Sequence, residues 1–540
     1  MTMFTWGMTT MRTFSSYGPI DKDNHYYAPR IALLEDACQQ LIGEDPTKGG
    51  HYITVWAPRQ TGKTWLMQQV MERLRAQGDF EVAILTMQFA RNVQDEQVVL
   101  RVLTDGLSRW FRRDFPTIAS FADLANLFTS QWFSKPLILI LDEFDALEES
   151  IINAFAALFR SIYTQRSNEM DRPSAEKSYL LHGLALIGVR SVLGIENVSG
   201  SPFNVQRSLR VPNLTQDEVS GMFRWYEEES GQVVEPAVVE RLFAETRGQP
   251  GLTGWLGELV TQTFNPPREQ PITLATFEKA YAAAVKVLPN NNILNIISKA
   301  RQAPYQEVVL EFFKIDRKAP FTFDDRHLSY LYTNGVIDYE LADDNEYYVR
   351  FACPFVQKRL FSYFANDLFR YLGGLYDPFE DLSHIINAQG LHIRNLMQLY
   401  ERYLQKNRHW LFKDAPRRST DLRIFEAVYH FNLFMYLSRF LENHRGQVTP
   451  EFPTGNGKLD LLVQYAGQRY GLEVKSFADQ TEYQRSLRQA ADYGRQLGLT
   501  TIALLLFVEA VDDQNRQKYE AHYQDQTTGV LVTPIFVATG

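Results

Sequence analysis

The chain of 540 residues has only two cysteines, Cys38 and Cys353. Two thiols cannot build a disulfide framework, and neither has a neighbouring Cys or His at zinc-binding spacing. A reducing cytoplasm is therefore the expected compartment. No stretch of about 18 apolar residues runs uninterrupted, and the N-terminus lacks a charged start followed by an apolar segment. We therefore expect neither a membrane span nor a signal peptide, and no membrane partner.

An excess of positive charge is also lacking. The net charge is −9, from 55 Lys and Arg against 64 Asp and Glu. This balance argues against a protein that coats nucleic acid with its whole surface, although a local basic groove stays compatible with it. No helicase motif set is present, which leaves a DNA motor or loader without support. With 45% hydrophobic and 22% charged residues, the chain is expected to be globular and to contain several domains.

The sequence does contain a phosphate-binding pattern. Residues 57–64 lie between an apolar run at 52–56 and a helical segment at 65–77. A strand, a turn and a helix in this order direct backbone N–H groups and the helix dipole at an anion. We expect Lys63 to reach the outer phosphates of ATP and Thr64 to ligate Mg²⁺. The expected nucleotide contacts of the loop are Ala57, which replaces the usual first glycine, Arg59, Gln60, Thr61, Gly62, Lys63 and Thr64.

Two later strands end in polar residues. The aliphatic run 137–141 is typical of a strand buried on both faces of a parallel sheet, and it is followed by Asp142 and Glu143. We expect Asp142 to hold the Mg²⁺ shell and Glu143 to polarise the attacking water. The next buried strand, at 184–189, ends in Arg190, which is either a sensor of the γ-phosphate or a salt-bridged surface arginine.

These motifs, followed by Arg247-Gly248-Gln249-Pro250-Gly251, resemble the STAND and origin-recognition-like branch of the AAA+ ATPases. The resemblance covers residues 25–290. It implies an ATPase core at 25–210 behind a flexible leader at 1–24, and a helical lid at 211–290 that brings Pro250 near the nucleotide. Family members often assemble with copies of themselves and use an arginine from the neighbouring subunit. Arg160 and Arg166 are the candidates for that arginine.

The middle of the chain alternates short helical segments with a hairpin. In residues 291–370 the hairpin is expected from Leu328–Leu331 through an acidic turn to 347–351, and this order resembles a winged-helix domain. The acidic stretch 338–346 favours packing over contact with DNA phosphates. Residues 371–418 are expected to be a helical connector. A basic stretch around Trp410 lies at the end of the connector. It is either a solvated linker or a binding surface for a strand of DNA.

A second charged constellation follows. An apolar helix is expected at 421–443, opened by Ser419 and Thr420, and a hairpin then turns at Ala466-Gly467. Centring the turn there puts Asp460 directly opposite Glu473, and strand alternation puts Glu473 and Lys475 on one face. A surface charge cluster is the alternative reading. An Asp and a Glu suit Mg²⁺ or Mn²⁺, and a nearby Lys can orient water for phosphodiester hydrolysis.

This hairpin resembles the core of the PD-(D/E)XK nucleases. The matching stretches are Gly457-Lys458-Leu459-Asp460 and Glu473-Val474-Lys475, followed by a Gln-x-x-x-Tyr helix motif at 489–493. The resemblance implies a restriction-endonuclease-like domain at 419–540. The catalytic residues that it implies are Glu426, Asp460, Glu473, Lys475, Gln489 and Tyr493, with Asp460 and Glu473 as metal ligands.

Taken together, the patterns predict a multidomain α/β protein that is an ATP-regulated, metal-dependent nuclease. DNA is the expected substrate; RNA, and the choice between internal and terminal cleavage, stay open. Fused modules of this kind resemble prokaryotic defence or mobile-element proteins, by analogy only. The alternative is a nucleotide-dependent switch that recruits a protein partner and carries an inactive nuclease fold.

Overall fold

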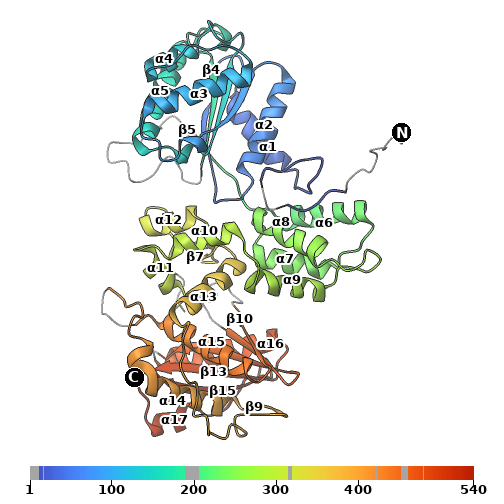
Figure 1. The fold of residues 1–540 in the computed structure, drawn as a ribbon, viewed down its shortest axis with the longest axis vertical. Coiled ribbons are helices and arrows are strands. Elements are labelled where there is room, and N and C mark those ends of the chain that lie inside the picture. The colour runs from blue at the N-terminus through green and yellow to red at the C-terminus, as the bar shows by residue number, and fades with distance from the viewer. Residues whose placement is uncertain are drawn as a thin grey trace, which may run out of the picture. The chain divides into compact units, whose positions relative to one another are not determined.

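The computed structural model describes residues 11–15, 18–188, 206–313, 319–419, 424–451, 460–477 and 479–540. The chain divides into two compact units, one formed by Met1–Asn292 with Phe323–Gly335 and the other by Ile293–Thr322 with Val336–Gly540. Each unit is built around its own sheet (Figure 1). Within the described ranges, no helix is long and apolar enough to cross a membrane.

A parallel sheet of five strands organises the first unit. The strands lie in the order β2-β3-β4-β1-β5, and every neighbouring pair is parallel. Their bounds are Tyr52–Trp56 (β1), Glu81–Thr86 (β2), Leu137–Asp142 (β3), Leu181–Gly188 (β4) and Gln206–Arg210 (β5). The parallel sheet predicted from the aliphatic runs is confirmed.

Helices cover both faces of this sheet (Figure 1). Because alternate strand residues face opposite sides, Leu139 and Leu186 pack towards α3, α4 and α5, whereas Ile140 and Ile187 pack towards α1 and α2. Burial on both sides explains why the strands read as continuous apolar runs. The helices are Ile31–Ile42 (α1), Lys63–Gln77 (α2), Glu96–Phe111 (α3), Phe121–Leu127 (α4) and Glu149–Asn168 (α5), with short turns Gln88–Ala90 (η1), Phe144–Ala146 (η2) and Ser174–Glu176 (η3).

Four helices follow at the position expected for the lid. The first begins with a capping box, in which the Thr215 and Glu218 side chains each accept a hydrogen bond from the other residue's backbone N–H. The helices are Gln216–Ser230 (α6), Pro236–Thr246 (α7), Pro250–Glu258 (α8) and Leu274–Lys286 (α9), with a π turn at Leu259–Thr263 (η4).

The N-terminal segment packs against these helices. Phe14 is 2% exposed, and its ring centroid lies 4.7 Å from that of Phe223 in α6. Gly257 of α8 provides the space for this ring, since a Cβ atom there would lie 2.5 Å from Phe14. The prediction of a flexible leader at 1–24 is therefore wrong for the part of this segment that the structure describes.

The middle segment is helical with one hairpin. Its elements are Asn291–Ala300 (α10), Tyr305–Phe312 (α11), Arg326–Thr333 (α12), Ile337–Leu341 (β6), Tyr347–Phe351 (β7) and Pro354–Leu368 (α13). The hairpin β6–β7 carries the expected acidic turn, but Leu328–Leu331 lies in α12 and is not part of it. Residues 323–335 group with the first unit, so the predicted winged-helix segment is divided between the two units.

The second unit is built on a mixed sheet in the order β10-β11-β12-β13-β15-β14. Its strands are Gln447–Glu451 (β10), Asp460–Tyr465 (β11), Gln468–Ser476 (β12), Thr501–Val508 (β13), Tyr523–Gln524 (β14) and Leu531–Ala538 (β15). The first three strands are antiparallel, while β12, β13 and β15 are parallel. Ala466 and Gly467, with φ of 50° and 74°, form the tight turn between β11 and β12.

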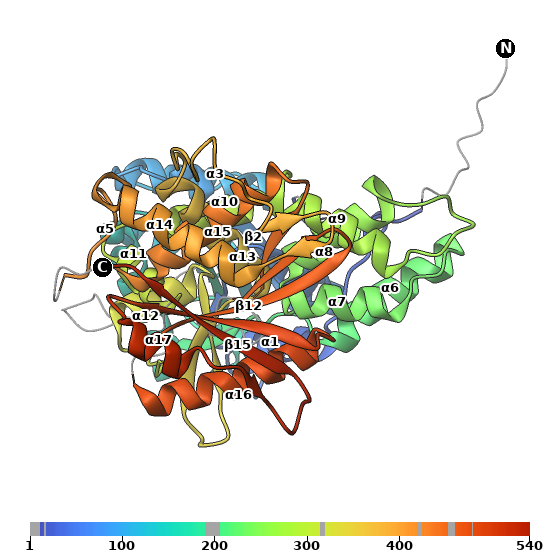
Figure 2. The same cartoon turned by 90° about the horizontal axis from the view of Figure 1, so that it is seen from below.

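Helices α14 (Ile393–Leu411) and α15 (Glu426–Glu442) lie on one side of this sheet and α16 (Gln480–Gln496) on the other (Figure 2). The ring of Tyr400 in α14 lies 6.5 Å from that of Phe507 in β13. The predicted connector at 371–418 thus contributes a helix to the fold that was expected to begin at 419. A small hairpin, Ile386–Asn387 (β8) with Gly390–Leu391 (β9), precedes α14, and Asp513–Tyr519 forms α17.

Helix α15 begins later than predicted. Its first residue is Glu426, with Phe425 at the N-cap position and no side-chain cap. The predicted opening residues Thr420 and Asp421 lie outside the described residues, and the helix that was expected over 421–443 is described from Glu426 onwards.

Candidate functional site

The loop between β1 and α2 has the backbone of an anion-binding turn. Gly62, at the N-cap of α2, has φ 87° and ψ 18°. A Cβ atom at this position would meet no atom of the described chain within 4 Å, so glycine is favoured here by its left-handed backbone and not by a lack of space. The Thr61 hydroxyl donates to the Pro58 carbonyl across 2.9 Å and stiffens the turn. The loop therefore presents N–H groups at the positive end of the helix dipole.

Lys63 is held above this loop. Its ammonium donates to the carbonyls of Ala57 and Pro58, both at 2.8 Å. Burial lowers the pKa of Lys63 to about 8, and the carboxylates of Asp145 and Asp142 oppose that shift. An anionic phosphate beside the ammonium would raise this pKa again.

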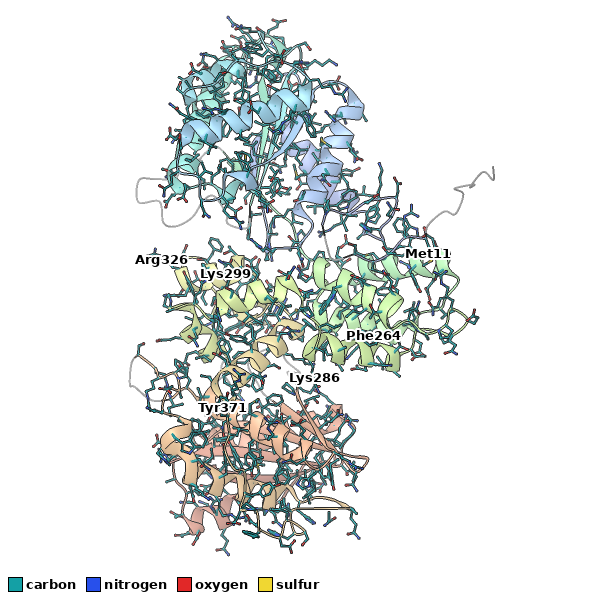
Figure 3. The ribbon with its side chains drawn as sticks, viewed as in Figure 1. Met11, Phe264, Lys286, Lys299, Arg326 and Tyr371 are labelled. Carbon is teal, nitrogen blue, oxygen red and sulfur yellow. The ribbon has the colours of Figure 1, made fainter. Side chains whose placement is uncertain are left out.

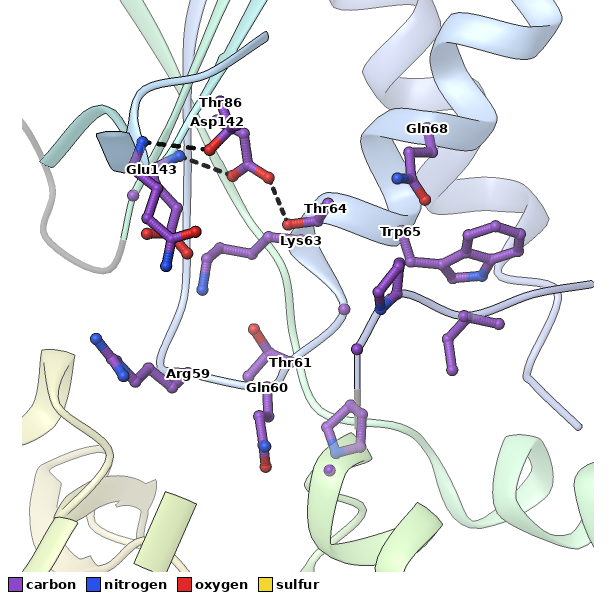
Figure 4. A pocket seen from close by; sticks show the side chains of 18 of the residues that line it. Arg59, Gln60, Thr61, Lys63, Thr64, Trp65, Gln68, Thr86, Asp142 and Glu143 are labelled. Atoms are coloured by element: carbon purple, nitrogen blue, oxygen red, sulfur yellow. Dashed lines mark hydrogen bonds between the residues drawn. The ribbon is translucent and has the colours of Figure 1, made fainter. Parts of the chain in front are cut away.

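Thr64 and Asp142 meet at the tip of β3 (Figure 4). The Thr64 hydroxyl donates to Asp142 Oδ2 across 2.7 Å, and the Glu143 backbone N–H donates to Asp142 Oδ1 across 2.8 Å. A hydroxyl and a carboxylate oxygen this close form part of the oxygen donor set that Mg²⁺ prefers. These two residues therefore fit the role of magnesium ligands.

Glu143 turns sharply out of the strand. It has φ 52° and ψ 38°, and its carboxylate lies 3.9 Å from the guanidinium of Arg91. The side chain is 44% exposed and lines the same cavity as Lys63. A solvent-accessible carboxylate beside the phosphate-binding loop is suited to act as a general base towards a water molecule.

The cavity around these groups measures about 620 Å³. This volume lies within the range of small-molecule and cofactor sites. The predicted residues that line it are Arg59, Gln60, Thr61, Gly62, Lys63, Thr64, Asp142, Glu143 and Pro250. Ala57 is fully buried and contributes its carbonyl to Lys63. Arg190, the predicted sensor, lies outside the described residues.

Other lining residues were not predicted. Part of the wall comes from the N-terminal segment through Ser15, Gly18, Pro19 and Ile20, and the rest from Trp65, Gln68, Thr86, Gln88, Arg91, Asp145, Ala146, Gly188 and Gly251. No periodicity marks the N-terminal segment in the sequence. Its role depends on the burial of Phe14, which is a tertiary contact.

Gln249 joins the lid to the phosphate loop. Its side-chain amide donates to the carbonyls of Arg59 and Gln60 at 3.1 and 3.3 Å, and its Oε1 accepts from the N–H of Leu252 at 2.6 Å. The Gly251 N–H donates to the Gln60 carbonyl at 3.0 Å. A Cβ at Gly251 would lie 2.4 Å from Gln60 Oε1. The turn before α8 is thus fitted closely against the loop.

The two arginines considered for contact with a neighbouring subunit differ. Arg166 is 4% exposed, and its guanidinium donates to the Ser174 hydroxyl across 2.6 Å. Its buried bonds hold it inside its own fold, so Arg166 is excluded as an intersubunit arginine. Arg160 is exposed on α5 and stays a prediction.

The second candidate site lies on the sheet of the second unit. The register between β11 and β12 pairs Asp460 with Glu473, as the turn predicts, and the register between β10 and β11 pairs Asp460 with Glu451. Paired residues of neighbouring strands share a face. Three acidic positions therefore lie in one row across the sheet. The structure describes Asp460 and Glu426 by their places at the start of β11 and α15 and not by their side chains.

Glu473 and Lys475 form a buried ion pair. They are 2% and 3% exposed, and Lys475 Nζ lies 3.6 Å from Glu473 Oε1. Their parallel partners on β13, Leu504 and Leu506, belong to the apolar cluster that packs under α16. The pair thus faces α16, the helix that carries the other two predicted residues.

Gln489 and Tyr493 lie one turn apart on α16. Tyr493 is 6% exposed and belongs to the same apolar cluster as Leu504, while Gln489 is half-buried. The geometry brings this helix, the ion pair and the acidic row to one face of the sheet. Three strands and one helix of the second unit thus contribute to this candidate site.

Lys358 was not predicted at this site. It lies on α13, is 4% exposed, and its ammonium is 3.0 Å from Glu451 Oε2. The register of Glu451 with Asp460 brings this second lysine to the end of the acidic row. Among the described side chains no three His, Cys, Asp or Glu are grouped to hold a metal ion, and Asp460 is not among those side chains.

Comparison with known proteins concerns the N-terminal part. Residues 15–266 match the family described as an AAA-like domain. No curated protein matches the chain. The match confirms the expected AAA-like module in this part of the chain, whereas the nuclease-like fold stays a prediction.

Similar solved structures include a Walker-type ATPase of Pyrococcus abyssi, at 13% identity and a TM-score of 0.44, with 64% of this chain and 99% of that one covered. The Aeropyrum pernix ORC1 protein in complex with DNA is 16% identical over 62% and 92% of the chains, with a TM-score of 0.33. The Aeropyrum pernix ORC2 protein in ADPNP–ADP complexes is 17% identical over 64% and 98%, with a TM-score of 0.36.

Proposed function

We propose that the first unit binds ATP with Mg²⁺ and hydrolyses it. The hydrogen bond from Thr64 to Asp142, beside Lys63 and at the start of α2, is the observation that supports this most directly. It brings together a phosphate-binding loop, a cation and two oxygen donors for magnesium. The cavity of about 620 Å³ has room for the nucleotide.

Each residue then has a part in hydrolysis. Lys63 leaves the Ala57 and Pro58 carbonyls and neutralises the outer phosphates, and the loop N–H groups orient them. Magnesium held by Thr64 and Asp142 would offset the charge that develops on the phosphate oxygens. Glu143 accepts a proton from the attacking water.

We further propose that the second unit hydrolyses phosphodiester bonds of nucleic acid, with DNA as the preferred substrate. The pairing of Asp460 with Glu473, two residues before the buried Lys475, supports this proposal. The two carboxylates would hold Mg²⁺ or Mn²⁺, which lowers the pKa of bound water. Lys475 orients the water and stabilises the charged transition state, and Gln489 positions the substrate.

A decisive experiment measures cleavage of labelled single- and double-stranded DNA and RNA by the purified chain. The conditions are Mg²⁺ or Mn²⁺, with and without ATP, for the natural protein, Lys475→Ala and Lys63→Ala. Metal-dependent cleavage that is lost in Lys475→Ala would support the nuclease. Altered cleavage in Lys63→Ala would show that ATP regulates it.

The buried state of the ion pair favours a second candidate function. A nucleophile-orienting lysine must touch its substrate, yet Lys475 is 3% exposed. The second unit would then be an inactive nuclease fold, and the chain a nucleotide-dependent switch for a protein partner. ATP hydrolysis without cleavage under any of these conditions, and full function of Asp460→Ala, would favour the switch.

A further inference from the structure

The C-terminal end of α14 carries an exposed cluster of basic and aromatic side chains. We define the basic aromatic patch as Arg370, Tyr371, Lys406, Trp410 and Lys413. Tyr371, marked in Figure 3, is 75% exposed and Trp410 is 38% exposed, which is unusual for such large rings. The nuclease and ATPase mechanisms use none of these residues.

The patch is held together by contacts within the second unit. Tyr403 of α14 donates to the Leu372 carbonyl across 2.8 Å, which ties the segment after α13 to the helix. A Cβ at Gly373 would lie 3.2 Å from the Trp410 ring, so the backbone there rests directly against the indole. The indole Nε1–H of Trp410 donates to Asn407 Oδ1 across 3.1 Å and fixes the ring.

Cations flank both rings. Lys406 and Trp410 are one helical turn apart and share a face of α14, and the Lys413 N–H donates to the Trp410 carbonyl across 3.3 Å in the turn that follows. The Arg370 guanidinium lies 5.7 Å from the centre of the Tyr371 ring.

These cations are available to a ligand. Among the described residues, Arg370, Lys406 and Lys413 have no ion-pair partner. The sequence from 402 to 420 holds six Lys and Arg residues with one acidic residue, Asp414; of the six, Lys406 and Lys413 belong to the patch, while Arg402 pairs with Glu380. The chain as a whole is acidic, with a net charge of −9, so this positive surface is a local feature that indicates an anionic ligand.

We propose that the basic aromatic patch binds single-stranded nucleic acid. Exposed rings on a cationic surface suit a ligand with both unstacked bases and phosphates, because bases stack on the rings while the cations neutralise the backbone. A duplex hides its base faces and can use only the cations. This inference rests on the proposed function in that it supplies a docking site for the substrate of the second unit.

The test is fluorescence anisotropy with a labelled dT20 strand and the full-length chain in EDTA, which prevents metal-dependent cleavage. Tyr371→Ala and Trp410→Ala should each weaken binding by at least about fivefold. The double variant Lys406→Ala/Lys413→Ala should lower the slope of log affinity against log salt by about 1.4. Lys279→Ala, an exposed lysine of α9, and Tyr347→Ala, an exposed tyrosine of β7, are matched controls and should leave binding unchanged.

Two results would overturn the inference. One is binding that the patch variants leave unchanged. The other is equal loss for a duplex and for dT20 in the ring variants, which would show that base stacking is not involved. If the patch variants bind dT20 normally while Lys475→Ala cannot cleave, the proposed binding site is rejected and the proposed nuclease activity is retained. If the patch variants lose dT20 binding but the natural protein cleaves under no condition, the binding site is retained and the nuclease activity is rejected.

Discussion

The Thr64 hydroxyl donates a hydrogen bond to Asp142 across 2.7 Å and so joins the first turn of α2 to the tip of β3. The bond brings together two residues that are 78 positions apart in sequence. The Glu143 N–H holds the other carboxylate oxygen of Asp142, which leaves its orientation well defined. In the proposed magnesium site, such a prearranged donor pair would need little reorganisation on binding the ion.

Replacing Asp142 by Asn should therefore reduce the rate of ATP hydrolysis much more than the affinity for ATP. The amide keeps the volume and one oxygen but loses the charge that magnesium requires, so kcat should fall by about 100-fold or more. Steady-state ATPase assays over a range of Mg²⁺ concentrations measure the effect. Asp105→Asn, on the exposed face of α3, is the matched control. An ATPase rate equal to that of the control would contradict the assignment of Asp142.

Nucleotide affinity should depend on pH through Lys63. Its pKa is about 8 before nucleotide binds because of burial, and the phosphates of a bound nucleotide raise it. Binding is then strongest well below pH 8 and weakens as pH rises through 8, with a slope that approaches about tenfold per pH unit until the raised pKa is reached. Titrations with a fluorescent ATP analogue from about pH 7.5 to about pH 9.5 span this range and measure the dependence.

The Lys63→Arg variant is the control for the pH profile. A guanidinium stays protonated throughout this range, so its affinity should not change with pH even if it is weaker overall. A natural protein whose profile is as flat as that of the arginine variant would show that Lys63 does not titrate in the pocket.

Gln249 should couple the lid to nucleotide binding. Gln249→Ala removes the bonds to the Arg59 and Gln60 carbonyls together with the cap on Leu252. We expect a loss of about 1 to 2 kcal/mol, seen as a lower Tm and a several-fold weaker affinity for ATP. Calorimetry and nucleotide titration measure the two effects. The exposed Gln262→Ala should change neither; equal behaviour of the two variants would mean that the Gln249 bonds are energetically neutral.

Local patterns predicted a large part of this structure. The pairing of Asp460 with Glu473 could be worked out because Ala466-Gly467 is a tight turn, and a turn of known length sets the register of both strands. The parallel sheet could be predicted because strands such as 137–141 are buried on both faces, which makes the apolar run continuous. In both cases the information is contained within one or two neighbouring elements.

Two of the errors, and two contacts that were not predicted, originate in tertiary packing. The anchoring of the N-terminal segment depends on Phe14 meeting Phe223, and no local pattern encodes that contact. The amphipathic character of α14 shows that one face is buried but not against which sheet, so its domain was wrongly assigned. The bonds of Gln249 to the loop and of Lys358 to Glu451 also link distant segments.

The ion pair between Glu473 and Lys475 should show strong energetic coupling. Breaking a buried pair by changing one partner leaves the other charge in a low-dielectric site, which costs about 3 to 5 kcal/mol, whereas replacing both partners costs less. Glu473→Gln and Lys475→Met should thus each lower the free energy of unfolding by more than the double variant does. Urea denaturation followed by the fluorescence of the full chain measures the three values.

A metal titration separates a structural pair from a metal site. If Glu473 is a ligand, Mn²⁺ should raise the Tm of the natural protein, and EDTA should reverse that shift, because an ion that binds only the folded state stabilises it. Glu473→Gln should lose the shift, while Lys475→Met should keep or enlarge it, since removing an ammonium 3.6 Å from the carboxylate makes the site more negative. A Tm that Mn²⁺ leaves unchanged in all three proteins would mean that the pair serves stability alone, and would favour the nucleotide-dependent switch over the nuclease.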